Sequence, residues 1–158
     1  MNENPALKRA HRYLEQFNFN LVPWEHEKTT KTAAEAADAL EVELGQIAKS
    51  ILFRSGEKYG LFVAAGDIKI DDKKVRSLLG GGKAKIAKPA EVEDITGYKI
   101  GGVCPYDIDR SVPIYLDRSM ERFDTVYTSA GTPHSLLPIT FKQLQQVTDG
   151  KIVDMEKE

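Results

Sequence analysis

The sequence has little of what several classes of protein require. It contains a single cysteine, Cys104, in 158 residues, so it can form neither an internal disulfide nor a cysteine-rich zinc site. No apolar run approaches the ~20 residues that a membrane span needs, and the first residues lack the apolar core of a signal peptide. We therefore expect a cytoplasmic protein that does not bind a membrane.

Histidine and the common nucleotide-binding and hydrolase motifs are also scarce. The three histidines, His11, His26 and His134, are scattered rather than set at the spacing of metal ligands. The glycines of "LLGGGKAK" lack the earlier glycine and the later Ser or Thr that complete a phosphate-binding loop. No Gly-x-Ser-x-Gly elbow is present for serine chemistry. We expect neither a metal nor a cofactor.

The composition that is present is ordinary for a folded domain. The chain is 41% hydrophobic and 29% charged, which is typical of a soluble globular protein. Its length fits one domain, which we place over residues 1–158. The formal net charge of −2 neither demands nor excludes a nucleic-acid partner.

One stretch is locally basic. Seven cations face two acids between residues 69 and 88, a local charge of +5 (7 − 2). A basic face can steer a polyanion, although a solvated helix and loop would have the same composition. The candidate phosphate contacts are Lys69, Lys73, Lys74, Arg76, Lys83 and Lys85.

The pattern of helices and strands is mixed. Capping residues and apolar spacing predict helices within 4–18, 32–40, 71–82, 88–97 and 140–150. Extended segments are predicted at 20–27, 47–56, 58–66, 83–87 and 111–117, with two more strands around a turn within 123–139. Several strand pairs read as antiparallel. We therefore predict an α/β (α+β) domain with a mixed sheet.

Three short motifs could carry chemistry. Lys49 lies in the apolar strand "IAKSILF", where a lysine is costly unless its amine reaches a cleft or an anion; simple alternation could instead place it on the solvent face. Gly101 and Gly102 of "KIGGVCPYD" allow a ligand or another chain close to the backbone, and Pro105 stiffens the turn, although a plain turn would need no more. The tight turn of "SAGTPHSLL" presents His134, which a solvent-exposed loop would also do.

Cys104 sits inside the second motif and offers an alternative. A Cys104–His134–Asp triad is possible, because such partners need only be close in space. A small buried cysteine is the commoner case.

The order of these motifs resembles the YbaK family, also called the prolyl-tRNA synthetase-associated or editing domain. The resemblance runs from about Glu25 to Val147. It rests on Lys49 in an early strand, on "GD" at Gly66-Asp67, and on the later GxxxP loop from Gly101 to Pro105, followed by "VPIYLD" and "SAGTPHSLLPIT".

The resemblance implies a mixed fold with a partly barrel-like central sheet and hydrolysis, in trans, of mischarged aminoacyl-tRNA. Lys49 would hold the tRNA 3′ end, and the Gly101 backbone would contact the terminal adenosine and the reacting region. No metal would be used, and a ribose hydroxyl of the tRNA would assist the water. The implied catalytic residues are Lys49, Gly101 and His134, and the implied substrate-binding residues are Ser50, Gly102, Pro105, Ser129, Gly131 and Pro133.

The third motif bears on the substrate. The branch that clears cysteinyl-tRNA resembles "SAGKRG", whereas this chain has Ser129-Ala130-Gly131-Thr132-Pro133-His134. That is similar to branches resembling the synthetase insertion, in which a histidine after a Gly-x-Pro turn shapes a pocket for small side chains. We expect alanyl-tRNA(Pro) first, then serine or threonine esters, then cysteine. The alternative is a non-catalytic module that binds tRNA or a synthetase.

Overall fold

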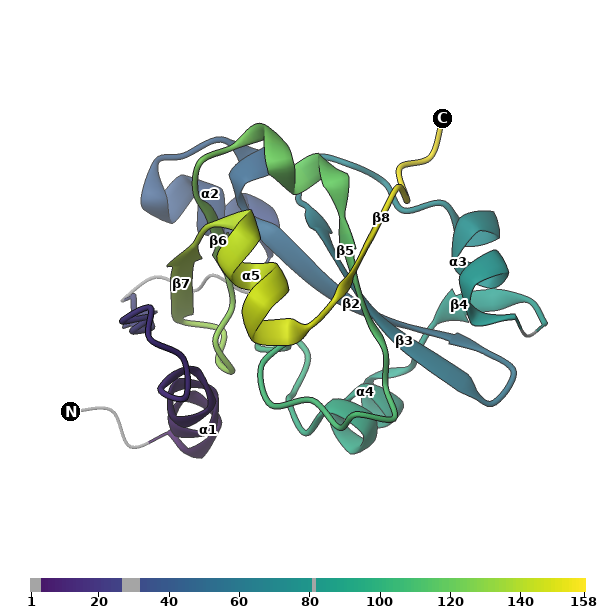
Figure 1. Cartoon of the computed structure of the whole chain (residues 1–158), viewed down its shortest axis with the longest axis horizontal. Helices are drawn as coiled ribbons and strands as arrows, with labels where there is room; N and C mark the ends of the chain where they lie inside the picture. The colour runs from purple at the N-terminus through teal and green to yellow at the C-terminus, as the bar shows by residue number, and fades with distance from the viewer. Residues whose placement is uncertain (1–3, 27–31, 81) are drawn as a thin grey trace.

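The computed structural model describes residues 4–26, 32–80 and 82–158 (Figure 1). The α-helices are α1 (Pro5–Leu14), α2 (Ala33–Leu40), α3 (Asp72–Leu79), α4 (Pro89–Thr96) and α5 (Phe141–Thr148), with short 3-10 helices η1 (Leu44–Gln46) and η2 (Arg118–Arg122). The strands are β1 (Trp24–Glu25), β2 (Ala48–Ser55), β3 (Lys58–Ala65), β4 (Ala84–Ile86), β5 (Ile114–Asp117), β6 (Val126–Thr128), β7 (Ser135–Ile139) and β8 (Lys151–Val153).

The strands form two sheets, and the predicted mixed α+β fold is confirmed. The larger sheet has the order β4-β2-β3-β5-β8, antiparallel from β4 to β3 and parallel from β3 to β8. The smaller sheet, β1-β7-β6, is antiparallel. An isolated bridge between Ile47 and Tyr127 links the two, but they do not close into a barrel. That residues 1–158 form a single domain remains a prediction.

Local signals place most of these elements. The Asn4 side chain accepts from the Ala6 and Leu7 amides and starts α1. Capping boxes start α2 at Thr32 and α5 at Thr140. These caps satisfy amides that have no partner inside the helix.

The structure differs from the predicted elements in three places. β8 was not predicted, because it has three residues, of which only Val153 is buried. The strand predicted at 111–117 begins at Ile114, after Pro113, whose carbonyl accepts from Leu61. The segment predicted at 20–27 contains only the two-residue β1, at the edge of the smaller sheet; residue 27 lies outside the described residues.

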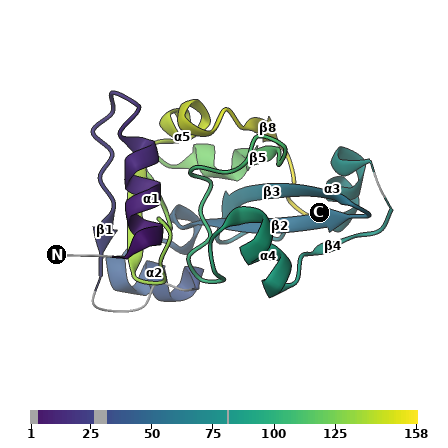
Figure 2. The ribbon, with the colours of Figure 1, turned by 90° about the horizontal axis from the view of Figure 1, so that it is seen from below.

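The helices α1 and α2 lie at one end of the molecule and α3 lies at the other (Figures 1 and 2). Both views place α1 and α2 beside the smaller sheet, and α3 with β4 at the opposite end (Figures 1 and 2). The largest hydrophobic cluster lies at the first of these ends and includes residues of α1, β3, β5, β6 and β7. The start of β2 is also at this end, beside the bridge to β6.

Candidate active site

A cavity of about 220 Å³ opens at the start of β2. It is bounded by the first turn of α2, by the loop that follows α4, and by β7. Its lining residues are Thr32, Ala33, Ala36, Ile47, Ala48, Lys49, Ser50, Ile100, Gly101, Val103, Ser129 and Leu136. Four of the residues predicted from the sequence, namely Lys49, Ser50, Gly101 and Ser129, therefore meet at one cavity although they lie up to 80 positions apart in the chain.

Lys49 is half-buried at this cavity. Its amine donates one hydrogen bond to the Ile68 carbonyl, at 2.5 Å. Burial lowers the pKa of the amine, and the nearby charge of Asp67 acts in the opposite direction. An ammonium group has three protons, and among the described residues the Ile68 carbonyl is the acceptor for one of them, so two remain for a ligand.

The backbone of Ser50 faces the cavity side of β2. Residues of an antiparallel strand direct their N–H and C=O groups alternately toward one neighbour and the other. The Leu52 carbonyl bonds Ala87, on the side away from β3, so the groups of Ser50 point to that side as well. β4 pairs only with Phe53 to Ser55. In the described part of the chain, the N–H and C=O of Ser50 have no protein partner.

Gly101 lines the same cavity in a backbone conformation that favours glycine. Its φ angle is +96°, where a Cβ atom would be strained. Glycine at this position therefore allows the loop to turn its backbone toward the cavity. Ile100, beside it, is a large exposed apolar side chain.

Gly102 and Gly131 do not line this cavity. A Cβ atom on Gly102 would lie 2.5 Å from the Gly131 carbonyl oxygen, and one on Gly131 (φ +104°) would lie 2.7 Å from the Ala6 carbonyl oxygen. Both glycines are buried. They allow the loop after α4, the loop after β6 and the start of α1 to pack closely, which is a different reason for glycine from the predicted access of a ligand.

His134 and Pro133 also lie outside the lining. His134 is exposed, its amide bonds the Thr132 hydroxyl, and its carbonyl accepts from His26. The Thr132 hydroxyl and the His26 amide therefore hold this turn, and His134 does not line the cavity of Lys49.

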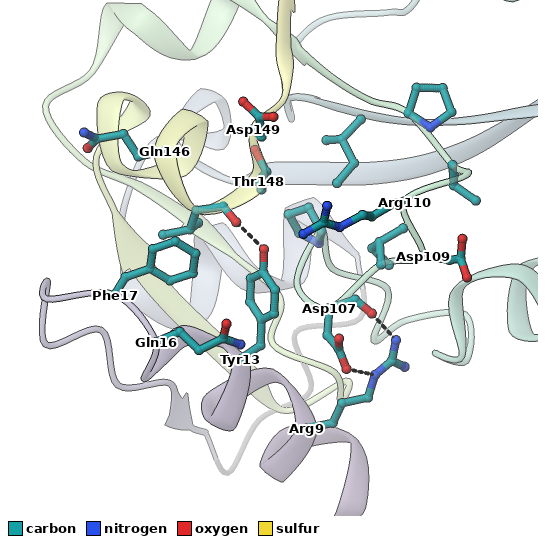
Figure 3. Close-up of a pocket in the computed structure, with 16 residues that line it drawn as sticks. Arg9, Tyr13, Gln16, Phe17, Asp107, Asp109, Arg110, Gln146, Thr148 and Asp149 are labelled. Carbon is teal, nitrogen blue, oxygen red and sulfur yellow. Dashed lines mark hydrogen bonds and ion pairs between the residues drawn. The ribbon is translucent and has the colours of Figure 1, made fainter.

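Pro105 lines a second, larger cavity of about 940 Å³ between α1, α5 and the 105–114 loop (Figure 3). Two of its lining residues, Arg9 and Asp107, form an ion pair with 2.9 Å between Nε and Oδ2. The Tyr13 hydroxyl donates to the Val147 carbonyl at 2.5 Å. None of Lys49, Ser50 and Gly101 reaches this cavity, so the GxxxP loop separates two cavities rather than lining one.

Most of the basic stretch lies away from the Lys49 cavity; the exception is Lys69, which directly follows Ile68, the residue whose carbonyl bonds the Lys49 amine. The other lysines belong to α3, β4 and the adjoining loops, at the far end of the larger sheet (Figure 1). Lys85 pairs with Arg54 in the sheet, five residues along β2 from Lys49, or about 16 Å at ~3.3 Å per residue. Lys74 is already bonded to the Glu156 carbonyl. Apart from Lys69, the side chains of the basic stretch could contact only a ligand that extends well beyond the cavity.

Cys104 is buried in the largest hydrophobic cluster. Burial raises the pKa of its thiol to about 12, so almost none of it is thiolate near neutral pH, and the thiolate is the nucleophilic form. Its environment fits the small buried cysteine and does not favour the triad with His134.

We expect Cys104→Ser to leave the deacylation rate within about twofold of wild type, because the thiol takes no part in catalysis. We also expect native protein at pH 8 to resist iodoacetamide, with labelling only after unfolding. Intact-mass measurement before and after adding denaturant checks the second point. A large loss of activity in a Cys104→Ser protein that is still folded would restore the thiol as a candidate nucleophile.

Two absences can be reported. Across residues 4–26, 32–80 and 82–158, no three His, Cys, Asp or Glu side chains are grouped so that they could hold a metal ion. In the same residues, no helix is long and apolar enough to cross a membrane.

Sequence reasoning missed part of the cavity wall. The first turn of α2 supplies Thr32, Ala33 and Ala36, and β7 supplies Leu136. The capping box at Thr32 located the start of the helix, but nothing in the local sequence shows that this turn faces β2.

Comparison with known proteins agrees with the fold. The family model described as "Aminoacyl-tRNA editing domain" matches residues 27–147. YwhH of Bacillus subtilis (strain 168), an uncharacterized protein, is 39% identical over 148 residues, which cover 93% of this chain and 94% of YwhH. EbsC of Enterococcus faecalis, described as a proposed Cys-tRNA(Pro)/Cys-tRNA(Cys) deacylase, is 28% identical over 127 residues (74% and 77%). A crystal structure of a proposed trans-editing enzyme for prolyl tRNA synthetase superposes with a TM-score of 0.90 at 34% identity and covers 99% of this chain and 100% of its own.

These findings define the class of the protein as an aminoacyl-tRNA editing enzyme, a deacylase. The chain belongs to the aminoacyl-tRNA editing domain family, whose model matches well over half of its length.

Proposed function

We propose that the protein hydrolyses, in trans, the ester bond of tRNA(Pro) that carries a small wrong amino acid, with alanine first. The observation that supports this most is the meeting of the Lys49 amine, the unpaired backbone edge at Ser50 and the Gly101 backbone around one small cavity. The aminoacyl group would enter this cavity, and the tRNA acceptor end would lie across its mouth.

Hydrolysis of this ester requires few catalytic side chains. An aminoacyl ester is already activated, so the enzyme must mainly orient a water and stabilise the oxyanion that forms when the water attacks the carbonyl carbon. Backbone N–H groups do this well, and one such donor is typically worth ~10²–10³ in rate. In our proposal the Ser50 N–H is that donor. The C–O bond to the ribose then breaks, and the ribose oxygen takes up a proton.

Lys49 and Gly101 would position the ester. The Lys49 ammonium supplies charge for the tRNA 3′ end, which fixes the reacting bond near the backbone donors. Gly101 allows the terminal ribose to approach the loop without a side chain between them. The lysines of the basic stretch would give weak phosphate contacts without sequence preference.

The size of the cavity supports a small aminoacyl group. It is smaller than the ~300–1,000 Å³ pockets that enclose drug-sized ligands, and Ala33, Ala36 and Ala48 form part of its wall. Alanine has one heavy atom fewer than serine or cysteine, which differ from each other only in oxygen against sulfur, and a pocket discriminates poorly at that level. The deacylase description of EbsC therefore keeps cysteine as a competing substrate.

A deacylation screen tests the proposal. Purified protein is incubated with tRNA(Pro) charged separately with alanine, serine, threonine, cysteine or proline, and the surviving ester is measured over time. We expect alanyl-tRNA(Pro) to be cleaved fastest and prolyl-tRNA(Pro) to be spared. Faster loss of the cysteinyl ester would overturn the substrate choice. Binding of tRNA without loss of any ester would favour the non-catalytic module.

A further inference from the structure

An arginine–aspartate pair lies behind Lys49, in segments that do not line the cavity. Both carboxylate oxygens of Asp67 bond the guanidinium of Arg122, with 3.0 Å from Oδ2 to Nη1 and 2.6 Å from Oδ1 to Nη2. Among the described residues Lys49 forms no ion pair with Asp67. Its amine donates instead to the carbonyl of Ile68, the next residue along the chain.

The pair is held from several sides. The Arg122 Nε donates to the Ser119 carbonyl at 2.7 Å, and the guanidinium lies 4.9 Å from the centre of the Phe123 ring. On the other side, a Cβ atom on Gly45 would lie 2.8 Å from Asp67 Oδ2, so the carboxylate rests directly on the Gly45 backbone. The two-point bond between a guanidinium and a carboxylate fixes orientation as well as distance.

The charges around the lysine act in opposite directions. Burial lowers the pKa of Lys49 and the negative charge of Asp67 raises it. The hydrogen bonds from Arg122 hold the pKa of Asp67 below its usual value, so the carboxylate stays ionised. Asp67 is the acid whose charge acts on Lys49, whereas the charges of Glu43 and Glu156 act on Arg122.

We propose that Asp67 and Arg122 are positioning residues for Lys49: Asp67 keeps the half-buried amine charged, while Arg122 occupies both carboxylate oxygens and so prevents Asp67 from capturing the ammonium. The amine then keeps two protons for the substrate, and its hydrogen bond to Ile68 sets its direction. This role rests on the proposed function, in which the Lys49 ammonium contacts the tRNA 3′ end.

Removing Asp67 and removing Arg122 should shift the pKa of Lys49 in opposite directions. In Asp67→Asn the counter-charge is lost, so the pKa of Lys49 falls. In Arg122→Gln the carboxylate is released and pairs with the ammonium directly, so the pKa of Lys49 rises and the amine turns away from the cavity. A purely structural role for the pair would not produce opposite shifts.

The experiment first measures the titration midpoint of Lys49 without substrate and then measures the deacylation rate with substrate. Labelling of lysines by a limiting amount of acetic anhydride across pH, followed by peptide mass spectrometry, gives the titration midpoint of Lys49 in wild type, Asp67→Asn and Arg122→Gln. Deacylation of alanyl-tRNA(Pro), corrected for spontaneous hydrolysis, is then followed across the same pH range.

We expect the Asp67→Asn variant to lose activity as the pH rises through the lowered titration midpoint of its Lys49, because the charged amine is the active form. We expect Arg122→Gln to be slower by about tenfold at every pH, since one charge-assisted contact to the substrate is lost. Arg118→Gln is the matched control, because Arg118 lies on the same 3-10 helix, is exposed, and pairs with Glu121 and Asp154.

The outcomes separate this inference from the proposed function. Midpoints that stay at the wild-type value in both variants, or that move in the same direction, would overturn the positioning role. Opposite shifts in a protein that cleaves no ester would support the charge arrangement and show that the proposed function is wrong. An equal shift of the Lys49 midpoint in Arg118→Gln would mean that loss of any arginine from this helix has the same effect, and would overturn the specific role of Arg122.

Discussion

Replacing Lys49 by alanine is expected to slow deacylation by roughly a hundredfold or more, the size of effect seen when one group that stabilises a transition state is removed. In the proposed mechanism the ammonium holds the tRNA 3′ end, and no other lysine or arginine lines the cavity in the part of the chain that the structure describes. A neighbour therefore cannot substitute for it. The measurement is single-turnover loss of alanine from alanyl-tRNA(Pro).

The same variant should fold normally. Lys49 is half-buried and burial lowers its pKa, so removing it also removes a desolvation cost. Lys58→Ala is the matched control, because Lys58 is an exposed lysine at the other end of the same hairpin. Unchanged activity in a folded Lys49→Ala protein would show that the lysine is not part of the reaction.

Replacing Gly102 by alanine is expected to give the largest loss of stability of the single changes considered. The added Cβ atom would lie 2.5 Å from the Gly131 carbonyl oxygen, 2.6 Å from its carbon and 2.9 Å from the Thr132 nitrogen. These are backbone atoms, which cannot rotate away as a side-chain end would. Such overpacking typically costs ~1–3 kcal/mol, which lowers the Tm of a domain of this size by roughly 2–12 °C.

Thermal unfolding of Gly102→Ala beside Gly82→Ala checks this, because a Cβ atom on Gly82 would meet nothing within 4 Å. We also expect slower deacylation in the folded fraction of Gly102→Ala, since Gly101 and Ser129, which line the cavity, lie close in sequence to the two clashing loops. A wild-type Tm for Gly102→Ala would show that the two loops are not packed as described.

The sequence predicted the parts of the site that depend on neighbours in the chain. Lys49 breaks an apolar strand, and Gly101 precedes a proline-stiffened turn, so both are visible as local exceptions to a regular pattern. Ser50 is predicted from the family resemblance, as the position that follows the lysine. The feature that matters there is the unpaired backbone edge, which exists because β4 ends before it.

The sequence by itself determined most helices and strands, the mixed α+β fold and the family, because caps, periodicity and motif order are written in consecutive residues. The tertiary structure alone decided which glycine faces the cavity and which packs against another loop, that His134 and Pro105 lie elsewhere, and that Arg122 holds Asp67 behind Lys49. Each of these depends on contacts between segments far apart in the chain, from 29 residues between Gly102 and Gly131 to 125 residues between Ala6 and Gly131, or on the end of a neighbouring strand. Such contacts are set by the packing of the whole domain, and no local pattern specifies them.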